Sequence, residues 1–266
     1  MGVDQNVFGE TGLHKRTWRD WVRDWVPAVA SLLLALAIVQ LAMFAGLNAA
    51  ALFDVSSDYG APGAHPPGHF EMLAAERMAA YFAAFQVSIV ALTLVAARLV
   101  PVLGLRTLAL TYPRGGLAAI AVAVVGLLAG SAAIGSLIYH WDRESFMHDL
   151  RPFAQMARSD SWWMLLAAAG AGAPLAEEML FRGLLFGGLR ASPLGFLGAA
   201  GISAGFWTAL HASYSMYALG LLFVIGVYFA WLRERTHSLW PSIVAHAVYN
   251  SAIVVALALA PETALQ

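Results

Sequence analysis

Long apolar stretches with few charged residues alternate with short polar segments along this sequence. A helix that spans a membrane needs about 20 consecutive, mostly apolar residues. The stretches that reach this length are Val26–Phe53, Met78–Leu105, Gly115–Tyr139, Ser161–Leu189, Ala191–Leu232 and Leu239–Ala260. The pattern therefore predicts an all-α fold, a polytopic bundle whose helices cross a membrane several times.

The stretch Ala191–Leu232 holds 42 residues without Asp, Glu, Lys or Arg. As a single helix it would be about 63 Å long, about twice the thickness of the hydrocarbon core of a bilayer. We therefore expect two spans there, with the break at Ser213–Ser215. The total is about seven membrane helices, and an eighth would require one of the long stretches to fold back.

Two of the polar segments have one apolar helical face, which is typical of an amphipathic helix that lies in the membrane interface. The apolar residues are Trp18, Trp21, Val22 and Trp25 in residues 11–25, and Phe146, Met147, Leu150 and Phe153 in residues 140–158. A third polar segment, residues 54–77, is rich in Gly and Pro in its first half and predicts an external loop.

The composition agrees with a membrane protein and excludes three other classes. Hydrophobic residues make up 60% of the chain and charged residues 12%, against about 45–50% and about 25% in soluble domains, and the mean hydropathy is +0.69. Such a chain has too few polar residues to cover a soluble core and is too apolar to be disordered. Its net charge of −1 offers no basic field for a nucleic acid. The absence of cysteine excludes disulfides, thiolate metal sites and a cysteine nucleophile.

The distribution of Lys and Arg predicts the orientation, because these residues concentrate in the cytoplasmic loops of membrane proteins. With seven spans, ten of the 15 basic residues fall on one side, four fall on the other, and Arg182 lies inside a span. We therefore expect an integral protein of the plasma (inner) membrane, with a cytoplasmic N-terminus and an external C-terminus.

The stretch Ser161–Leu189 carries three charges in mid-span, where each costs about 2.5–3.5 kcal/mol and usually faces an interior cavity. Glu178 and Arg182 are four residues apart, so they share a helical face and can pair. Glu177 points about 100° away from Glu178 and is left without a local partner. We therefore assign Glu178 and Arg182 to a supporting ion pair and Glu177 to chemistry. The alternative is that all three only join helices or bind a lipid headgroup, but two carboxylates with one arginine leave a charge uncompensated.

Two of the eight histidines lie in or at the end of apolar stretches. His211 ends the apolar run before the predicted break, and His246 lies in the last stretch, where Asn250 shares its helical face. Counted from the predicted cytoplasmic ends, Glu177, His246 and His211 lie at depths of about 20, 12 and 25 Å. Residues that act on one water molecule should instead lie at the same depth.

These side chains are suited to water chemistry in two ways. Glu177 and a neutral histidine can take a proton from water, while a His–Asn pair donates hydrogen bonds to an oxyanion. Alternatively, Glu177, His211 and His246 could hold Zn²⁺ and leave one position for water. The HExxH zinc motif is absent, and the serines offer no GxSxG elbow with a convincing acid partner.

Three motifs carry a family resemblance: EExxxR from Glu177 to Arg182, WxxxH from Trp207 to His211, and HxxxN from His246 to Asn250. In this order and on successive apolar stretches, they resemble the CPBP intramembrane protease family, which includes the type II CAAX prenyl endopeptidases and Abi-type proteins. The resemblance covers about residues 173–251. It departs at Trp207, where phenylalanine is usual. Because a large aromatic is kept, we expect the cavity wall to differ and the chemistry to survive.

The resemblance implies an intramembrane endopeptidase with its site in a polar cavity within the bilayer. The implied catalytic residues are Glu177, His211, His246 and Asn250, with Glu178 and Arg182 in support. The glutamate and His211 would activate water, and His246 with Asn250 would stabilise the oxyanion. Both a metalloprotease and a metal-independent glutamate mechanism are proposed for the family, so Zn²⁺ as a cofactor stays open. The expected partners are the lipid bilayer and a membrane-associated protein or peptide substrate.

The chain then divides into a cytoplasmic amphipathic segment (residues 1–25), three membrane helices with their loops (26–160) and a catalytic membrane core (161–266). Two other functions use the same residues: a non-enzymatic scaffold or immunity-type protein on the same fold, and a proton-coupled transporter with Glu177 in its relay. The intact motif residues argue against the scaffold, and the sequence shows no inverted repeat that would support the transporter.

Overall fold

The computed structural model describes residues 17–52 and 69–261, and this part of the chain forms helices and no strands. The elements are α1 (Trp18–Ala51), α2 (His69–Leu99), η2 (Leu105–Leu108), α3 (Gly116–Trp141), α4 (Arg143–Ala157), α5 (Trp162–Leu165), η3 (Leu166–Gly172), α6 (Ala173–Glu177), η4 (Glu178–Leu185), α7 (Phe186–Arg190), α8 (Gly195–Ala209), α9 (Met216–Thr236) and α10 (Trp240–Leu259). η2 is a 3₁₀ helix, whereas η3 and η4 are π-helical. The predicted all-α fold is confirmed.

Six of the described helical segments are long and apolar enough to cross a membrane. They are Trp18–Ala51, Glu76–Leu99, Gly116–Trp141, Trp162–Arg190, Met216–Thr236 and Trp240–Leu259. The remaining predicted span corresponds to α8, whose 15 residues rise only about 22 Å, against a hydrocarbon core of about 30 Å. The break expected at 213–215 is confirmed, because α9 begins at Met216 with Ser215 as its N-cap. The polytopic membrane bundle is thus confirmed, with six full-length spans and one short helix in the described part.

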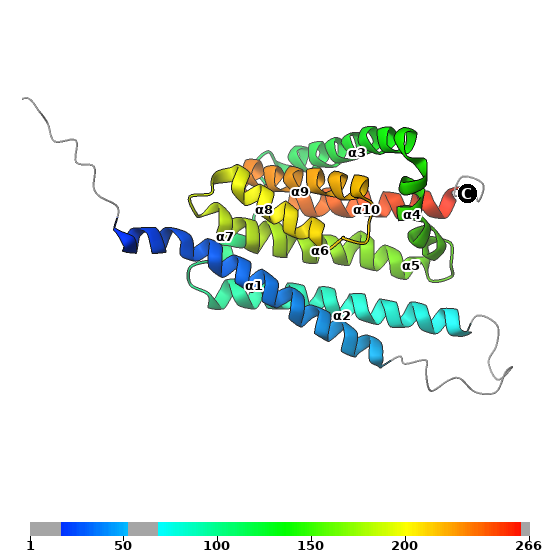
Figure 1. Cartoon of the computed structure of the whole chain (residues 1–266), viewed down its shortest axis with the longest axis horizontal. Coiled ribbons are helices and arrows are strands. Elements are labelled where there is room, and N and C mark those ends of the chain that lie inside the picture. Colours follow the sequence, from blue (N-terminus) through cyan, green and yellow to red (C-terminus); the bar gives the residue numbers. More distant parts are fainter. Residues whose placement is uncertain (1–16, 53–68, 262–266) are drawn as a thin grey trace, which may run out of the picture.

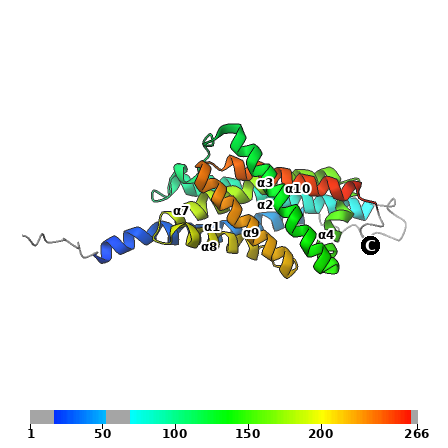
Figure 2. The same cartoon turned by 90° about the horizontal axis from the view of Figure 1, so that it is seen from above.

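The continuous helix from Trp162 to Arg190, here called the central helix, runs through α5, η3, α6, η4 and α7. It packs against the paired helices α1 and α2 on one side and against α8, α9 and α10 on the other (Figure 1). α3 packs on α9 and α10 (Figure 2). α1 approaches α7 closely because Gly188 has no side chain: a Cβ there would lie 2.8 Å from the carbonyl oxygen of Pro27.

Two π-helical segments interrupt the central helix, and such segments often mark functional sites. The first is held from both sides by side chains of neighbouring helices. Gln86 of α2 donates a hydrogen bond to the carbonyl oxygen of Ala168 at 3.0 Å, and Asn250 of α10 donates one to that of Ala169 at 2.8 Å. The second begins at Glu178, so the boundary between α6 and η4 falls between the two adjacent glutamates.

The helix expected in residues 140–158 is present as α4, with Met147 buried and Glu144 exposed, and its position in the membrane interface stays a prediction. The other expected interfacial helix is wrong in its described part. Residues 18–25 are the first turns of α1, because Thr17 caps the helix there and Pro27 does not end it. Residues 11–16 of that prediction lie outside the described residues. With 34 residues, α1 is about 51 Å long and projects beyond the bundle (Figure 1).

The loop expected at residues 54–77 is shorter than predicted, because α2 already begins at His69. Residues 54–68 of this segment lie outside the described residues. The helix α2 therefore begins before the apolar stretch that predicts the second span, because helix formation does not require every residue to be apolar.

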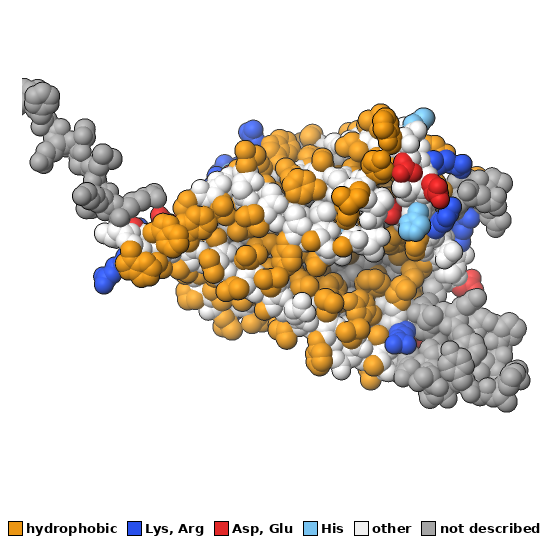
Figure 3. All heavy atoms as spheres, viewed as in Figure 1, with side chains coloured by type: hydrophobic (Ala, Val, Ile, Leu, Met, Phe, Trp, Pro, Cys, Tyr) orange, Lys and Arg blue, Asp and Glu red, His pale blue; other side chains and the backbone are white. Residues whose placement is uncertain are grey.

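The surface fits a membrane-embedded bundle. Figure 3 shows hydrophobic side chains over the middle of the molecule and charged side chains towards its two ends. At one end, Arg190 of α7 pairs with Glu234 of α9 at 2.9 Å, and Arg233 donates to the carbonyl oxygen of Thr107 in η2 at 2.6 Å. The chain is an integral membrane protein, and among its described residues a buried cluster of charges, described next, lies inside the bundle.

Candidate active site

Glu178 and Arg182 form an ion pair inside the bundle. Their side chains are 0% exposed, and Arg182 Nη1 lies 2.9 Å from Glu178 Oε1, as the spacing of four residues predicts. The guanidinium also lies over two aromatic rings, 4.4 Å from the centroid of Trp207 and 5.2 Å from that of Phe229. Both charges are thus enclosed by protein groups from η4, α8 and α9.

Glu177 lies beside this pair in a different environment. Its side chain keeps 19% exposure. Its Oε2 accepts a hydrogen bond of 2.6 Å from the indole Nε1 of Trp207, and no group in the described part of the chain donates to its Oε1. Glu177 has no local partner on its own helix, as expected, and α8 supplies its partner in the folded protein.

His246 of α10 lies between the two carboxylates. Its Nδ1 is 3.2 Å from Glu178 Oε1, its Nε2 is 4.0 Å from Glu177 Oε2, and its ring stacks on Phe229 at 5.1 Å. An ionised carboxylate only accepts hydrogen bonds, so the proton of the neutral ring is on Nδ1. Nε2 therefore has a lone pair in the neutral ring and an N–H only in the imidazolium.

His211 lies in the turn after α8 and reaches the cluster through Trp207. Its Nδ1 is 3.0 Å from the backbone oxygen of Trp207, which only accepts, so the neutral ring has its lone pair on Nε2. The His211 ring meets the Trp207 ring edge-on at 5.4 Å and the Tyr214 ring at 5.6 Å. Within residues 17–52 and 69–261, His211 forms no hydrogen bond or ion pair with Glu177.

The turn that carries His211 is hydrogen-bonded to α4. Asp149 of α4 accepts hydrogen bonds from the Ser215 backbone N at 3.0 Å and from its hydroxyl at 2.5 Å. The same hydroxyl accepts from the backbone N of Ala218 and so caps α9. One short segment therefore joins α4, α9 and the catalytic candidate His211.

Asn250 shares the α10 face with His246, but its carboxamide binds a backbone carbonyl, that of Ala169. One of the two N–H groups on Nδ2 thus joins α10 to η3, and the other N–H is left for a ligand. A role of Asn250 at an oxyanion stays a prediction.

The unequal depths counted along the sequence are wrong, because the folded chain gathers the three residues around one indole. The rings of His211 and His246 lie 5.4 and 5.7 Å from that of Trp207, to which Glu177 is hydrogen-bonded. The physical reason is packing between helices: α8, which carries Trp207, and α10, which carries His246, both pack against the central helix.

The side chains as placed do not fit a zinc site at Glu177, His211 and His246. In the described ranges, no group of three or more His, Asp or Glu residues could hold a metal ion. Zinc lies about 2.0–2.2 Å from its ligands. Glu177 Oε2 and His246 Nε2 are 4.0 Å apart, which a shared ion would reach only in an almost linear arrangement, and Oε2 already accepts from Trp207.

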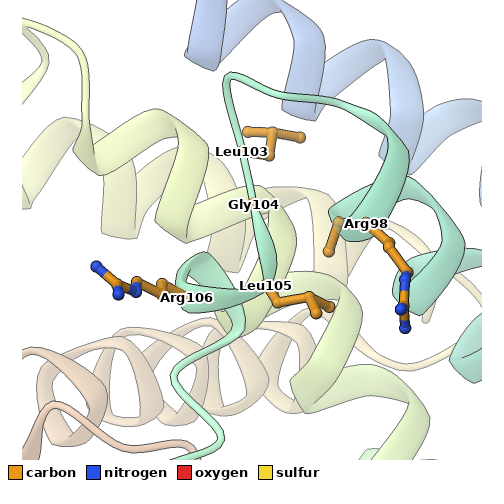
Figure 4. Close-up of a pocket in the computed structure, with 6 residues that line it drawn as sticks. Arg98, Leu103, Gly104, Leu105 and Arg106 are labelled. Atoms are coloured by element: carbon orange, nitrogen blue, oxygen red, sulfur yellow. The ribbon is translucent and has the colours of Figure 1, made fainter.

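A hollow of about 470 Å³ lies elsewhere, between the end of α2 and η2. It is lined by Ala97, Arg98, Leu103, Gly104, Leu105 and Arg106. Arg98 and Arg106 point away from each other in Figure 4. None of the predicted site residues lines this hollow, so the chemistry of the charged cluster, not the shape of the surface, locates the candidate site.

The contacts of three residues in and around the cluster are not predicted from the sequence. Trp207 was expected only to line a cavity, although its indole N–H, which phenylalanine lacks, was a readable signal. Phe229, which stacks on His246, and Asp149, which holds the turn, gave no signal, because their contacts join elements far apart in the chain.

The segment that carries the cluster matches a known family. Residues 159–252 match the family described as type II CAAX prenyl endopeptidase Rce1-like. This segment contains all three motifs, so the match confirms the resemblance to the CPBP family. No curated protein and no solved structure matches the chain.

Arg182→Ala is expected to lower the free energy of unfolding by about 3–5 kcal/mol, because it leaves the Glu178 carboxylate buried without its partner. Arg190→Ala is the matched control, since it breaks the half-exposed pair with Glu234 and should cost about 0–1 kcal/mol. Folded yield and thermal unfolding in one detergent measure both. A loss for Arg182→Ala no larger than that for Arg190→Ala would contradict the supporting role of the buried pair.

Proposed function

We propose, from the match of residues 159–252 and the geometry around Glu177, that the chain is an intramembrane endopeptidase that cleaves a membrane-associated protein or peptide. The observation that carries this proposal is a partly exposed carboxylate oxygen, Glu177 Oε1, next to a buried ion pair and a histidine. A charge at such a depth is costly and usually functional, and the supporting pair does not need this second carboxylate.

In this proposal Glu177 is the general base that takes a proton from water. A general base must lie within hydrogen-bond reach of that proton. Oε1 is the oxygen that can do so, because Oε2 already accepts from Trp207. His211 assists with the lone pair on its Nε2, which the hydrogen bond at Nδ1 makes available.

His246 and Asn250 are the proposed donors to the oxyanion. Glu177, Glu178 and Arg182 together carry a charge of −1, so a protonated His246 brings the cluster to neutrality. The same proton places an N–H on Nε2, which is the donor that an oxyanion requires. Asn250 contributes the N–H that does not bind Ala169.

The reaction then balances with water and side chains alone. Glu177 accepts one proton as the water oxygen adds to the carbonyl carbon of the substrate. The tetrahedral oxyanion collapses, the C–N bond breaks, and Glu177 returns its proton to the leaving nitrogen. The products are a carboxylic acid and an amine, which become a carboxylate and an ammonium when the acid gives its proton to the amine, and the enzyme regains its starting charge.

Glu177→Gln is expected to lower cleavage by about 10²- to 10⁴-fold, because an amide cannot accept the proton of water. The assay uses purified protein with a farnesylated CAAX peptide and its unprenylated form. Glu144→Gln, on the exposed face of α4, is the control and should cleave as wild type does. Wild-type cleavage by a folded Glu177→Gln variant would refute the proposal, and a full cellular phenotype of that variant would favour the non-enzymatic scaffold.

The metal content of the same preparations decides between the two mechanisms proposed for the family. If the reaction uses only water and side chains, the protein is expected to be fully active without metal and after chelation. Activity that disappears on chelation and returns with Zn²⁺ would instead assign the site to a metal.

We infer that the end of the bundle with Arg190 and Arg233 is cytoplasmic and that the α4 end is external, in the plasma membrane. The support is the excess of basic residues at the first end, which fits the rule for cytoplasmic loops. The N-terminus would then be cytoplasmic and the C-terminus external.

Single cysteines test this orientation cleanly, because the chain has no native cysteine. His148→Cys on α4 is expected to react with a membrane-impermeant maleimide in intact cells. Arg235→Cys, exposed at the opposite end, should react only after permeabilisation. The reverse labelling pattern would overturn the orientation.

A further inference from the structure

Trp207 contacts every charged or titratable member of the cluster except Glu178. Its Nε1 donates to Glu177 at 2.6 Å, and its ring lies 4.4 Å from the Arg182 guanidinium. The rings of His211 and His246 meet it edge-on, and its own backbone oxygen holds the His211 ring. The side chain is only 2% exposed, so these contacts also fix the indole in place.

We propose that Trp207 is a positioning residue of this peptidase: its indole N–H holds Glu177 Oε2, so that Oε1 faces the water to be activated. The inference rests on the proposed function and deepens it. It also gives a physical meaning to the departure from phenylalanine at this position, since phenylalanine fills much of the same volume but donates no hydrogen bond.

The indole is suited to this role because its N–H is a donor only and cannot compete for the proton of water. A hydrogen bond to an ionised acceptor is short and strong, and 2.6 Å between Nε1 and Oε2 is short. Without it, the carboxylate of Glu177 could rotate about its side-chain bonds. Small misplacements of a reacting group cost rate, up to about 10²-fold for 1 Å.

A packing role alone predicts a different result. Phe229 and Arg182 already enclose the Trp207 ring, and a phenylalanine would keep much of this contact. If Trp207 only filled space, its replacement by phenylalanine would lower stability and leave the catalytic constant of the folded protein unchanged.

The first test is kinetic. Trp207→Phe is expected to lower kcat by about 10- to 100-fold with KM unchanged, because the base is misplaced while substrate contacts remain. Trp163→Phe makes the same change at a 56% exposed position and should leave both constants unchanged. A kcat within twofold of wild type for folded Trp207→Phe, or a change confined to KM, would overturn the inference.

The second test follows an NMR signal and does not depend on catalysis. The Trp207→Phe variant is needed only to assign that signal. Among the indole N–H signals of the nine tryptophans in a ¹⁵N-labelled sample, the one lost in Trp207→Phe belongs to Trp207. Glu177→Ala should shift this signal and speed its hydrogen exchange, whereas the Trp163 signal should not move. An unchanged Trp207 signal would overturn the inference even if the protein is an active peptidase. Wild-type protein that cleaves no peptide, with the signal shifted as expected, would overturn the proposed function instead.

Discussion

The buried ion pair between Glu178 and Arg182 is the constraint on which the arrangement of this bundle depends. The charge of a guanidinium that is removed from water must be compensated. Here the Glu178 carboxylate pairs with it, two aromatic rings lie over it, and the His246 imidazole lies beside the carboxylate. These groups come from η4, α8, α9 and α10. One pair of charges therefore sets the relative position of four elements, and it does so in the interior of an otherwise apolar bundle.

The placement of Glu177 follows from that constraint. It precedes Glu178 directly, so the same packing that orders the ion pair also brings Glu177 to the junction of α6, α8 and α10. Its partial exposure separates it from Glu178, although one peptide bond joins them. The two adjacent carboxylates thus differ in environment in the way that a supporting group and a general base should differ.

Local periodicity was enough to predict the helices, the break before Met216 and the pairing of Glu178 with Arg182, because each depends on neighbours within one segment. It did not predict that Trp18–Trp25 continue into α1, since the tryptophan stripe favours a separate helix in the interface, whereas the helix runs on through Pro27. Nor could it give the hydrogen bond from Trp207 to Glu177, which joins residues 30 positions apart and depends on how α8 packs against the central helix. The residues of the candidate site could be predicted from their motifs. The partners of Glu177 and Asn250 could not, because they come from other helices that pack against them.

Chemical rescue of the missing carboxylate is a direct test of whether Glu177 is the general base. Purified Glu177→Ala and Glu178→Ala proteins are compared for peptide cleavage with increasing formate, which can supply a carboxylate base in the space left by a truncated side chain. If Glu177 is the general base, formate restores part of the cleavage in Glu177→Ala and none in Glu178→Ala. Cleavage by Glu177→Ala at the wild-type rate without formate, or rescue confined to Glu178→Ala, would contradict this role.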